Sequence, residues 1–391
     1  MIALVVVALA LTVTVALVAL HAVDGRPGDR SGGDPVAAVS RLRVGCESGW
    51  VVPGWGDAPV PWDGGFVMAH SSLDGPSRVH VSADGVDWRE SAPGDVVTLE
   101  RHVNVVSGYG PAAYLLGWDA RGPAVWRTEG GDRWESTPLL PGDRNPPAPR
   151  NLVITAGPRG VLVVGANGGF DTEHREVCAW YSRDGRSFSG MFAIPEPEAG
   201  YEDYAPVAAA TSNDFLLGLC DRDRCSILSS ADGTTWHDIS AGFPQTGRTG
   251  IGGIAGNASV VVVERCPAPD QERVSDEPRM WCRRDGAWRP ARTDPGTLPD
   301  AGVVPAHDRY LWAIRNRGTG FIAPGGTYGD VAGVIWHSSD GAHWRRTPVR
   351  DNGFDRARGI RDVVIGNNRA LAFGISADPA DGVLIRQTPT P

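Results

Sequence analysis

The sequence predicts an all-β fold in which one four-stranded unit is repeated along the chain. The stretch 336–344, WHSSDGAHW, contains an Asp-Gly pair followed by a tryptophan, and five related stretches precede it. Their equivalent positions are 46, 54, 48, 53 and 55 residues apart. A period of about 50 residues with one signature per period is typical of stacked structural units. The equivalent positions are Asp84, Gly130, Asp184, Asp232, Asp285 and Asp340.

Short apolar runs between these motifs predict the other strands. They are rich in valine and isoleucine and end at glycine or polar residues, which is typical of β-strands. Each unit then has three strands, a tight turn and a fourth strand. Such sheets repeated radially form a β-propeller, and seven runs of each kind predict seven blades. First strands are expected to begin near residues 50, 103, 152, 207, 251, 303 and 363, and second strands at 66–69, 114–117, 161–165, 215–218, 260–263, 310–313 and 370–374.

The Asp-Gly motif has a structural explanation at each of its positions. Asp-Gly between apolar strands is a strong hairpin signal, because glycine tolerates a positive φ angle. An aspartate carboxylate can accept backbone N–H bonds two residues on, and the aromatic ring that follows can cover the hairpin. Six copies cannot all be active sites, so we assign them a structural role. The residues assigned to it are Asp84, Asp184, Asp232, Asp285, Asp340, Trp88, Trp134, Trp236, Trp288 and Trp344.

The first 40 residues predict a membrane attachment. Residues 2–23 are apolar apart from two threonines and a histidine, which is long enough for a helix that spans a bilayer. Residues 24–40 are rich in Gly, Asp, Arg and Pro and predict a flexible tether. We expect a transmembrane anchor at 1–23, a tether at 24–40 and an extracellular propeller at 41–391. A cleaved signal peptide and secretion are the alternative.

Six cysteines in an exported chain suit an oxidising compartment. We expect disulfides Cys220–Cys225 and Cys266–Cys282, because each pair lies at the facing ends of neighbouring strands. Cys46 and Cys178 belong to different units, and their pairing stays open.

Charge and composition argue against several classes of function. The net charge is −9, there is no lysine, and no basic stripe is present, so a nucleic-acid partner is not expected. No spacing of cysteine or histidine predicts a zinc site, and the glycine-rich run 323–330 lacks the ending of a phosphate-binding loop. We therefore expect no metal and no cofactor.

The repeated motif resembles the Asp-box, or bacterial neuraminidase repeat, with one residue fewer between Asp and Gly. Over residues 45–389 the chain is similar to exported, sialidase-like actinobacterial propellers. In that family the Asp-box turns lie away from the catalytic face and stabilise hairpins. The resemblance implies a propeller fold, but the Arg-Ile-Pro type motif of the sialidases is absent. Arg41 and Arg43 lie near its place, within SRLRVG, which has the pattern of a strand.

We expect a binding or scaffold module for a protein, peptide or glycan; a divergent, sialidase-like glycoside hydrolase is the alternative. Variable connections on a rigid scaffold are where function concentrates, so we expect the ligand on the face opposite the Asp-Gly turns. Tyrosine and arginine are frequent in binding hot spots. The candidate ligand-binding residues are Tyr201, Glu202, Tyr204, Arg175, Arg315, Arg317 and Tyr328.

The two ends of the predicted propeller complement each other. The last unit stops after its third strand, at 382–387, whereas the run 39–45, VSRLRVG, has no partner. We expect this N-terminal run to complete the last blade, which would remove an open sheet edge.

Overall fold

The computed structural model describes most of the repeated region, and every regular element in the described residues is a β-strand. None of these residues forms a helix that could span a bilayer. The expected anchor, the tether and the run 39–45 lie outside them. The described residues are 49–52, 55–56, 59–71, 78–85, 87–91, 106–119, 121–140, 150–167, 176–194, 206–220, 224–245, 249–267, 280–293, 310–311, 315–317, 320–326, 334–348, 357–366, 369–376 and 383–389.

The described strands form seven sheets, and all of them belong to one compact unit, residues 33–391. The second to fifth sheets each have four consecutive antiparallel strands. They are the second sheet, β7 (Val106–Tyr109), β8 (Ala112–Asp119), β9 (Gly122–Thr128) and β10 (Glu135–Pro138); the third, β11 (Arg150–Gly157), β12 (Gly160–Asn167), β13 (Glu176–Ser182) and β14 (Phe192–Ala193); the fourth, β15 (Val207–Ala210), β16 (Phe215–Cys220), β17 (Cys225–Ser230) and β18 (His237–Asp238); and the fifth, β19 (Thr249–Gly256), β20 (Val260–Pro267), β21 (Met280–Arg284) and β22 (Ala287–Pro290).

The other three sheets depart from this simple order. The first and sixth sheets have additional strands, and the seventh combines strands from both ends of the described chain. They are the first sheet, β2 (Trp55–Gly56), β3 (Val60–Trp62), β4 (Gly65–Ser71), β5 (Arg78–Ser82) and β6 (Arg89–Glu90); the sixth, β23 (Arg292–Thr293), β24 (Tyr310–Leu311), β25 (Arg315–Arg317), β26 (Gly320–Gly326), β27 (Val334–Ser338) and β28 (His343–Pro348); and the seventh, β29 (Ala357–Gly366), β30 (Arg369–Ser376), β31 (Val383–Pro389) and β1 (Gly49–Val52).

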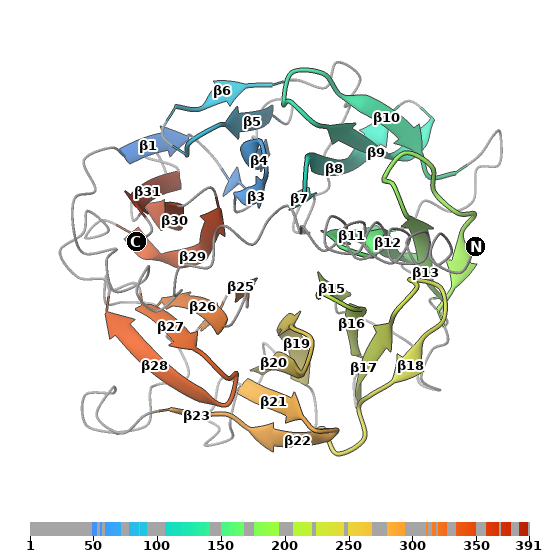
Figure 1. The fold of residues 1–391 in the computed structure, drawn as a ribbon, viewed down its shortest axis with the longest axis vertical. Helices are drawn as coiled ribbons and strands as arrows, with labels where there is room; N and C mark the ends of the chain where they lie inside the picture. The colour runs from blue at the N-terminus through green and yellow to red at the C-terminus, as the bar shows by residue number, and fades with distance from the viewer. Residues whose placement is uncertain are drawn as a thin grey trace, which may run out of the picture. The chain divides into compact units, whose positions relative to one another are not determined.

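Consecutive sheets pack side by side through their first strands. Strand β7 contacts β3 and β11, β15 contacts β11 and β19, and β29 of the seventh sheet contacts β3 of the first. The sheets of this unit therefore succeed one another around a common centre, with the short fourth strands outermost (Figure 1). This arrangement is the radial repetition that the sequence period predicts.

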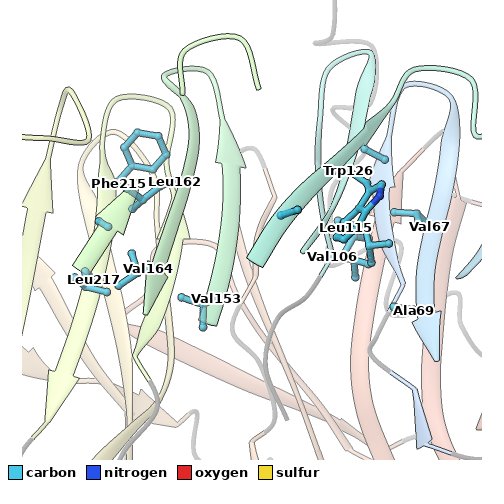
Figure 2. Close-up of a cluster of buried hydrophobic side chains, with 14 of the residues drawn as sticks. Val67, Ala69, Val106, Leu115, Trp126, Val153, Leu162, Val164, Phe215 and Leu217 are labelled. Atoms are coloured by element: carbon cyan, nitrogen blue, oxygen red, sulfur yellow. The ribbon is translucent and has the colours of Figure 1, made fainter. Parts of the chain in front are cut away.

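The core lies between neighbouring sheets, because each sheet has an apolar layer on both faces. Leu115 and Trp126 of the second sheet lie beside Val67 of the first, and all three are almost completely buried (Figure 2). The same cluster continues to Leu162 and Phe215 of the third and fourth sheets. Since the middle strands are buried on both sides, they read as continuous apolar runs rather than as alternating ones.

The seventh sheet is completed by a strand from the N-terminal part of the chain, but it is a different strand from the expected one. Strand β1 pairs antiparallel with β31, and Val51 lies opposite Leu384. The run beginning at residue 50, which we expected to start the first sheet, occupies this place. The first sheet starts instead with β2 and β3, which pair with the two ends of β4. The sequence Val-Pro-Trp of β3 did not indicate a strand, since proline is rare inside strands.

The sixth sheet also differs from the expectation. The run 310–313 predicted its second strand, but residues 310–311 pair with the far end of β26, and β25 pairs with its near end. The second strand is β26, whose Phe321, Ile322 and Ala323 are buried. Its Pro324 and three glycines are typical of a loop, so the sequence did not indicate a strand here. An additional strand, β23, pairs in parallel with the outermost β28, so this sheet is not purely antiparallel.

Each sheet has two ends of different character. At one end, here called the turn end, short turns join the first strand to the second and the third to the fourth; residues 158–159 and 183–187 are examples in the third sheet. At the opposite, connection end, the chain passes from the second strand to the third and from one sheet to the next, as at residues 168–175 and 141–149. Antiparallel pairing places all connections of one kind at the same end.

Candidate functional site

The Asp-Gly turns at the turn end share one hydrogen-bond pattern, and a serine organises it. In the fourth sheet, Ser230 Oγ accepts the Gly233 N–H at 2.9 Å and donates to Asp232 Oδ1 at 3.1 Å. The same two bonds are made at Ser82, Ser182 and Ser338. The serine thereby satisfies a buried backbone donor and positions the aspartate through local hydrogen bonds.

The aspartate of each such turn caps the backbone that follows it. Asp232 Oδ1 accepts the N–H groups of Thr235 at 2.7 Å and Thr234 at 2.8 Å. These bonds, that of Thr235 first, hold the pKa of Asp232 well below its usual value. Hydrogen bonding to the charged form of a carboxyl group favours that form. The carboxylate therefore stays ionised, and both of its oxygens accept hydrogen bonds from backbone N–H groups or hydroxyls of the turn itself.

Two of the six motif positions differ from this pattern. In the second sheet Gly130 takes the aspartate's place, and Thr128 Oγ1 accepts the Gly131 N–H at 2.8 Å. In the fifth sheet Asp285 has a φ angle of 52° and Gly286 of 79°, and their neighbours Arg284 and Ala287 are paired. This is a two-residue hairpin turn with two positive φ angles. The assignment of Asp285 to the Asp-box group was wrong in this respect, because no serine precedes it at the required spacing.

The tryptophans that follow the turns differ in the hydrogen bond that their indole N–H makes. Trp88 and Trp344 donate their indole N–H to the glycine carbonyl of their own turn, at 3.1 and 2.9 Å. Trp134 and Trp288 donate instead to the preceding sheet, at Ser91 Oγ and the Ile239 carbonyl. The buried Nε1 of Trp236 has no hydrogen-bond partner among the described residues. Several of these rings therefore join neighbouring sheets as well as sealing a hairpin.

The turn glycines pack directly on the preceding sheet. A Cβ atom at Gly185 would lie 2.3 Å from the ring of Tyr114, and one at Gly233 would lie 2.4 Å from the ring of Tyr181. Gly341 approaches Val262 of the fifth sheet in the same way. These turns are contact points between sheets, and the lack of a side chain is part of the contact. They leave no room for a ligand at the glycine.

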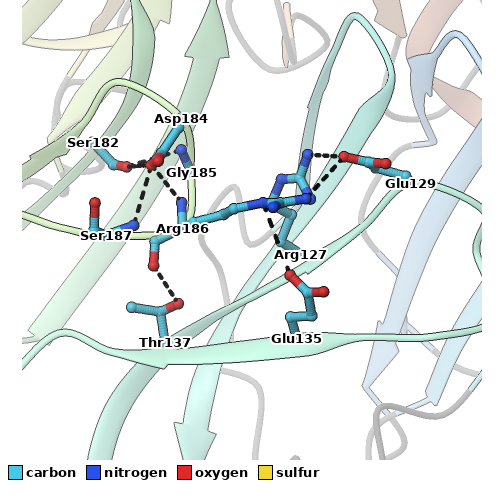
Figure 3. Close-up of polar contacts among 9 residues, drawn as sticks. All are labelled: Arg127, Glu129, Glu135, Thr137, Ser182, Asp184, Gly185, Arg186 and Ser187. Carbon is cyan, nitrogen blue, oxygen red and sulfur yellow. Dashed lines mark hydrogen bonds and ion pairs between the residues drawn. The ribbon is translucent and has the colours of Figure 1, made fainter.

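A charged hollow of about 330 Å³ lies at the turn end of the second and third sheets. Arg127 of β9 and Arg186 of the third-sheet turn both bind Glu129, and Arg186 also lies 4.0 Å from Glu135 (Figure 3). Thr137 Oγ1 donates to the Arg186 carbonyl at 3.0 Å. The side chains come from adjacent sheets, so the network bridges them. The residues that line the hollow are Arg127, Thr128, Glu129, Gly130, Asp132, Arg133, Glu135 and Arg186.

The electrostatics of this hollow suit an ion-pair network better than acid–base chemistry. The hydrogen bond from Arg127 comes first among the causes that lower the pKa of Glu129. Burial alone would lower the pKa of Arg127, but its bonds to Glu129 and Tyr114 raise it. Burial raises the pKa of Tyr114. A general acid at neutral pH needs a carboxyl group whose pKa is raised, so Glu129 does not fit that role.

The structure places two of the seven candidate ligand-binding residues. Arg315 and Arg317 belong to β25, which pairs with β26 and contacts β19, so they lie on a first strand near the centre of the sheets. Sequence reasoning had put them in a connection between the second and third strands. That placement was wrong, because β26 was not recognised as a strand. The other five, Arg175, Tyr201, Glu202, Tyr204 and Tyr328, lie outside the described residues.

The cysteines follow the expectation at one pair only. Cys220 and Cys225 lie directly opposite each other on β16 and β17 and form a disulfide, with Cα atoms 4.1 Å apart. Cys282 is a buried thiol that is not in a disulfide, so the expected bridge to Cys266 is not formed. The register explains this, because Cys282 lies opposite Val262 and Cys266 lies four residues farther along β20. Cys178 is also a buried thiol.

Within the described residues, no group of three or more His, Cys, Asp or Glu side chains is placed to hold a metal ion.

Comparison with known proteins identifies the fold. The polysaccharide lyase Uly1 matches 87% of this chain and 91% of its own, with a TM-score of 0.53 and 9% identity. The β-propeller domain of the Trilobed protease from Pyrococcus furiosus matches 87% and 98%, with a TM-score of 0.51 and 7% identity. The chain has a β-propeller fold. No protein-family model and no curated protein sequence matches it.

The acylaminoacyl peptidase of Pyrococcus horikoshii matches 90% of this chain with a TM-score of 0.52 and 9% identity. Only 54% of the peptidase chain is covered, so this chain spans about half the length of that protein. At such identities the likeness concerns the architecture, because one fold carries many unrelated activities.

Proposed function

We propose that this chain is a seven-bladed β-propeller of the Asp-box type, anchored in the cell membrane through residues 2–23, that binds an extracellular protein, peptide or glycan. The observation that carries the proposal is the contrast between the two ends of the sheets. The turn end is occupied by short hairpins that pack on one another. The connection end has the long segments, and five of the seven candidate recognition residues belong to them in the sequence, whereas Arg315 and Arg317 lie on β25.

The contrast is clear within the third sheet and its surroundings. Only Pro158 and Arg159 separate β11 from β12, and the Asp184 turn is fixed by its own serine. In contrast, residues 168–175 separate β12 from β13, and residues 194–206 separate β14 from β15. Segments of this length on a rigid scaffold are the usual place of binding residues. Residues 194–206 include Tyr201, Glu202 and Tyr204.

The cell exterior as the location is supported by the Cys220–Cys225 disulfide. Structural disulfides form and persist in oxidising compartments and are rare in the cytosol. The bridge joins β16 to β17 at the connection end of the fourth sheet.

The test uses the full chain in its native membrane. Protease added to intact cells should degrade the propeller, and the anchor should remain in the membrane fraction. A mature protein that begins near Val23 would instead indicate a cleaved signal peptide. Photo-crosslinking on intact cells should then identify bound surface proteins, and a glycan array should identify sugars. Release of sugar from the array would support the glycoside hydrolase alternative.

Two sets of variants locate the binding surface. Tyr201→Ala with Tyr204→Ala should abolish binding and leave the melting temperature unchanged. The matched control changes two exposed turn-end residues, Arg133→Ala with Arg183→Ala, and should bind normally. Loss of binding in the control alone would show that the ligand occupies the turn end.

A further inference from the structure

The turn between the third and fourth strands of the second sheet lacks the carboxylate that the complete Asp-Gly turns contain. Gly130 stands in the place of the aspartate, although the turn has the same number of residues as that of the fourth sheet. Thr128 Oγ1 accepts the Gly131 N–H at 2.8 Å, as a serine does in the complete turns. Gly131 has a φ angle of 77°, close to the 75° of Gly233. The backbone is therefore arranged as in a complete turn, and one side chain is missing.

No structural requirement explains the glycine at position 130. Gly130 is not one of the glycines with a positive φ angle, and no atom lies within 4 Å of the place where its Cβ would be. The hollow of about 330 Å³ at this turn is lined by Gly130 together with Thr128, Asp132 and Arg133. It therefore extends over the part of the turn where the complete turns have the aspartate side chain.

The donors that such an aspartate would bind are present at this turn. In the third, fourth and sixth sheets, the aspartate accepts the hydroxyl hydrogen of the serine and the N–H groups two and three residues after itself. The equivalent donors here are the Thr128 hydroxyl and the N–H groups of Asp132 and Arg133, and within the described residues none of them has an acceptor. Thr128 is only 1% exposed. A buried donor without an acceptor costs free energy, so this turn gains from an acceptor that a ligand brings.

The charge at the hollow also favours an anion (Figure 3). Each of the three carboxylates that line it lies within 4.0 Å of an arginine, whereas the exposed Arg133 has no ion-pair partner among the described residues. Arg127 is buried, and its Nε has no hydrogen-bond partner there. A carboxylate that enters the hollow is therefore balanced by a cation that no other carboxylate neutralises. The existing pairs are Arg127 and Arg186 with Glu129, Arg186 with Glu135, and Arg89 with Asp132.

We infer that the turn of the second sheet binds the carboxylate of a ligand, which takes over the role of the missing aspartate. The carboxylate accepts hydrogen bonds from the Thr128 hydroxyl and from the N–H groups of Asp132 and Arg133. The Arg133 guanidinium supplies the opposite charge, and the rest of the hollow accommodates the atoms that carry the carboxylate. This site lies at the turn end and depends neither on the proposed membrane anchor nor on a ligand at the connection end.

One of these donors can be observed alone, because the chain contains no lysine. The full-length Arg133→Lys variant, which keeps the positive charge, is labelled with α-¹⁵N-lysine and studied by NMR in detergent micelles. Its only labelled backbone amide is that of position 133. The matched control is Ser187→Lys, which places the label at the equivalent N–H of the third sheet. Asp184 Oδ1 already accepts that N–H at 3.2 Å.

The probes are acetate and the blocked peptide acetyl-Gly-Asp-Gly-amide, added at constant ionic strength and neutral pH. We expect a saturable downfield shift of the position-133 signal and no saturable shift at position 187 or with the Asn analogue of the peptide. Saturation by acetate and by the peptide at similar concentrations would show that a small free acid is sufficient. Saturation by the peptide alone would assign the site to an acidic side chain of a peptide.

A variant that restores the aspartate decides whether the vacant place is the site. In the labelled background, Gly130→Asp should shift the position-133 signal downfield without any probe, since its own carboxylate then accepts that N–H. It should also raise the probe concentration at half-saturation by at least about tenfold, because the acceptor place is filled. The site would be overturned by a position-133 signal that responds to neither probe, by a response that Gly130→Asp leaves unchanged, or by a signal that Gly130→Asp itself does not move.

Discussion

The serine two residues before the aspartate has a larger role in the Asp-Gly turns than the sequence pattern suggested. Positive φ at the glycine and capping by the aspartate could both be expected from the residue types. That Ser182 Oγ would bind both the Asp184 carboxylate and the Gly185 N–H could not, because serine is common at many loop positions. Its recurrence in four of six motifs was the signal that could have been used.

Glycine at these turns can be needed for two separate reasons, a positive φ angle and a close contact with a neighbouring side chain. Two glycines of the fourth sheet distinguish these reasons. Gly233 has a φ angle of 75° and abuts the Tyr181 ring, whereas Gly242 has a φ angle of 85° and no atom near its would-be Cβ. Gly242→Ala should cost about 1 kcal/mol of unfolding free energy, from backbone strain alone. Gly233→Ala should cost about 1–3 kcal/mol more, because the methyl group overlaps the ring. Urea unfolding measures both, and equal costs would contradict the contact.

The aspartate of the sixth-sheet turn, Asp340, should make the free energy of unfolding depend on pH in the acid range. Burial alone would raise the pKa of Asp340, but hydrogen bonds from the His343 ring and backbone and from the Ala342 N–H lower it to about 2. A carboxyl group with a depressed folded-state pKa stabilises the fold above its unfolded value, near pH 4. That contribution is lost as the pH falls toward 2.

The unfolding free energy of the Asp340→Asn variant should therefore fall less between pH 5 and pH 2.5 than that of the unmodified protein. Urea unfolding at each pH measures both. His343→Ala removes one of the hydrogen-bond partners and should give an intermediate pH dependence. If the asparagine variant and the unmodified protein lost equal stability over this range, Asp340 would not contribute as its contacts indicate.

At the scale of elements, the regular units could be predicted from sequence and the irregular ones could not. Five of the seven expected first strands coincide with strands β7, β11, β15, β19 and β29, because each contains a short apolar run bounded by glycine or a polar residue. Strands β3 and β26 were missed, since each contains a proline. Prediction from short runs fails where burial by neighbouring sheets overrides local preference.

The charged hollow was missed for a different reason. Its ion pair between Arg186 and Glu129 joins residues 57 positions apart on two sheets. Each residue alone has the sequence pattern of a solvated turn. Only the knowledge that consecutive Asp-Gly turns lie side by side would have brought the two together. The candidate ligand-binding residues were chosen from long connections, and their placement could be checked only at Arg315 and Arg317.

The hairpin of β16 and β17 allows a test of the cysteine assignment. Replacement of Cys220 and Cys225 by serine should lower the unfolding free energy by about 2 kcal/mol, as the chain-entropy model gives for so short a loop. Cys282→Ser is the control that leaves the bridge in place, and added reductant should lower its unfolding free energy by as much as it lowers that of the unmodified protein. Mass spectrometry under non-reducing conditions should find the 220–225 link; a link between Cys266 and Cys282 would contradict the register of β20 and β21.

At the scale of the whole molecule, closure of the seventh sheet by β1 should determine stability. Removal of residues 1–48 leaves β1 in place, whereas removal of residues 1–52 deletes it and exposes β31 as an open edge. The longer truncation should lower the melting temperature by about 3 °C, because a loss of about 2 kcal/mol is divided by an unfolding entropy of about 0.7 kcal/mol per degree for a domain of this size. Thermal unfolding followed by circular dichroism gives the melting temperature of each truncated protein. Equal melting temperatures would show that β1 does not close the domain.

The pairing of β1 with β31 also sets an order of events during synthesis. Gly49 and Arg386 lie at opposite ends of the described sequence, so this pairing closes the longest loop available to the chain. For a loop of that length the entropic cost is about 5 kcal/mol. A chain that is still being synthesised has its first strand ready and its last strand missing. Until Val383–Pro389 has been made, β1 must stay unpaired without joining a strand of another molecule, which makes completion of the chain the step that protects the protein from aggregation.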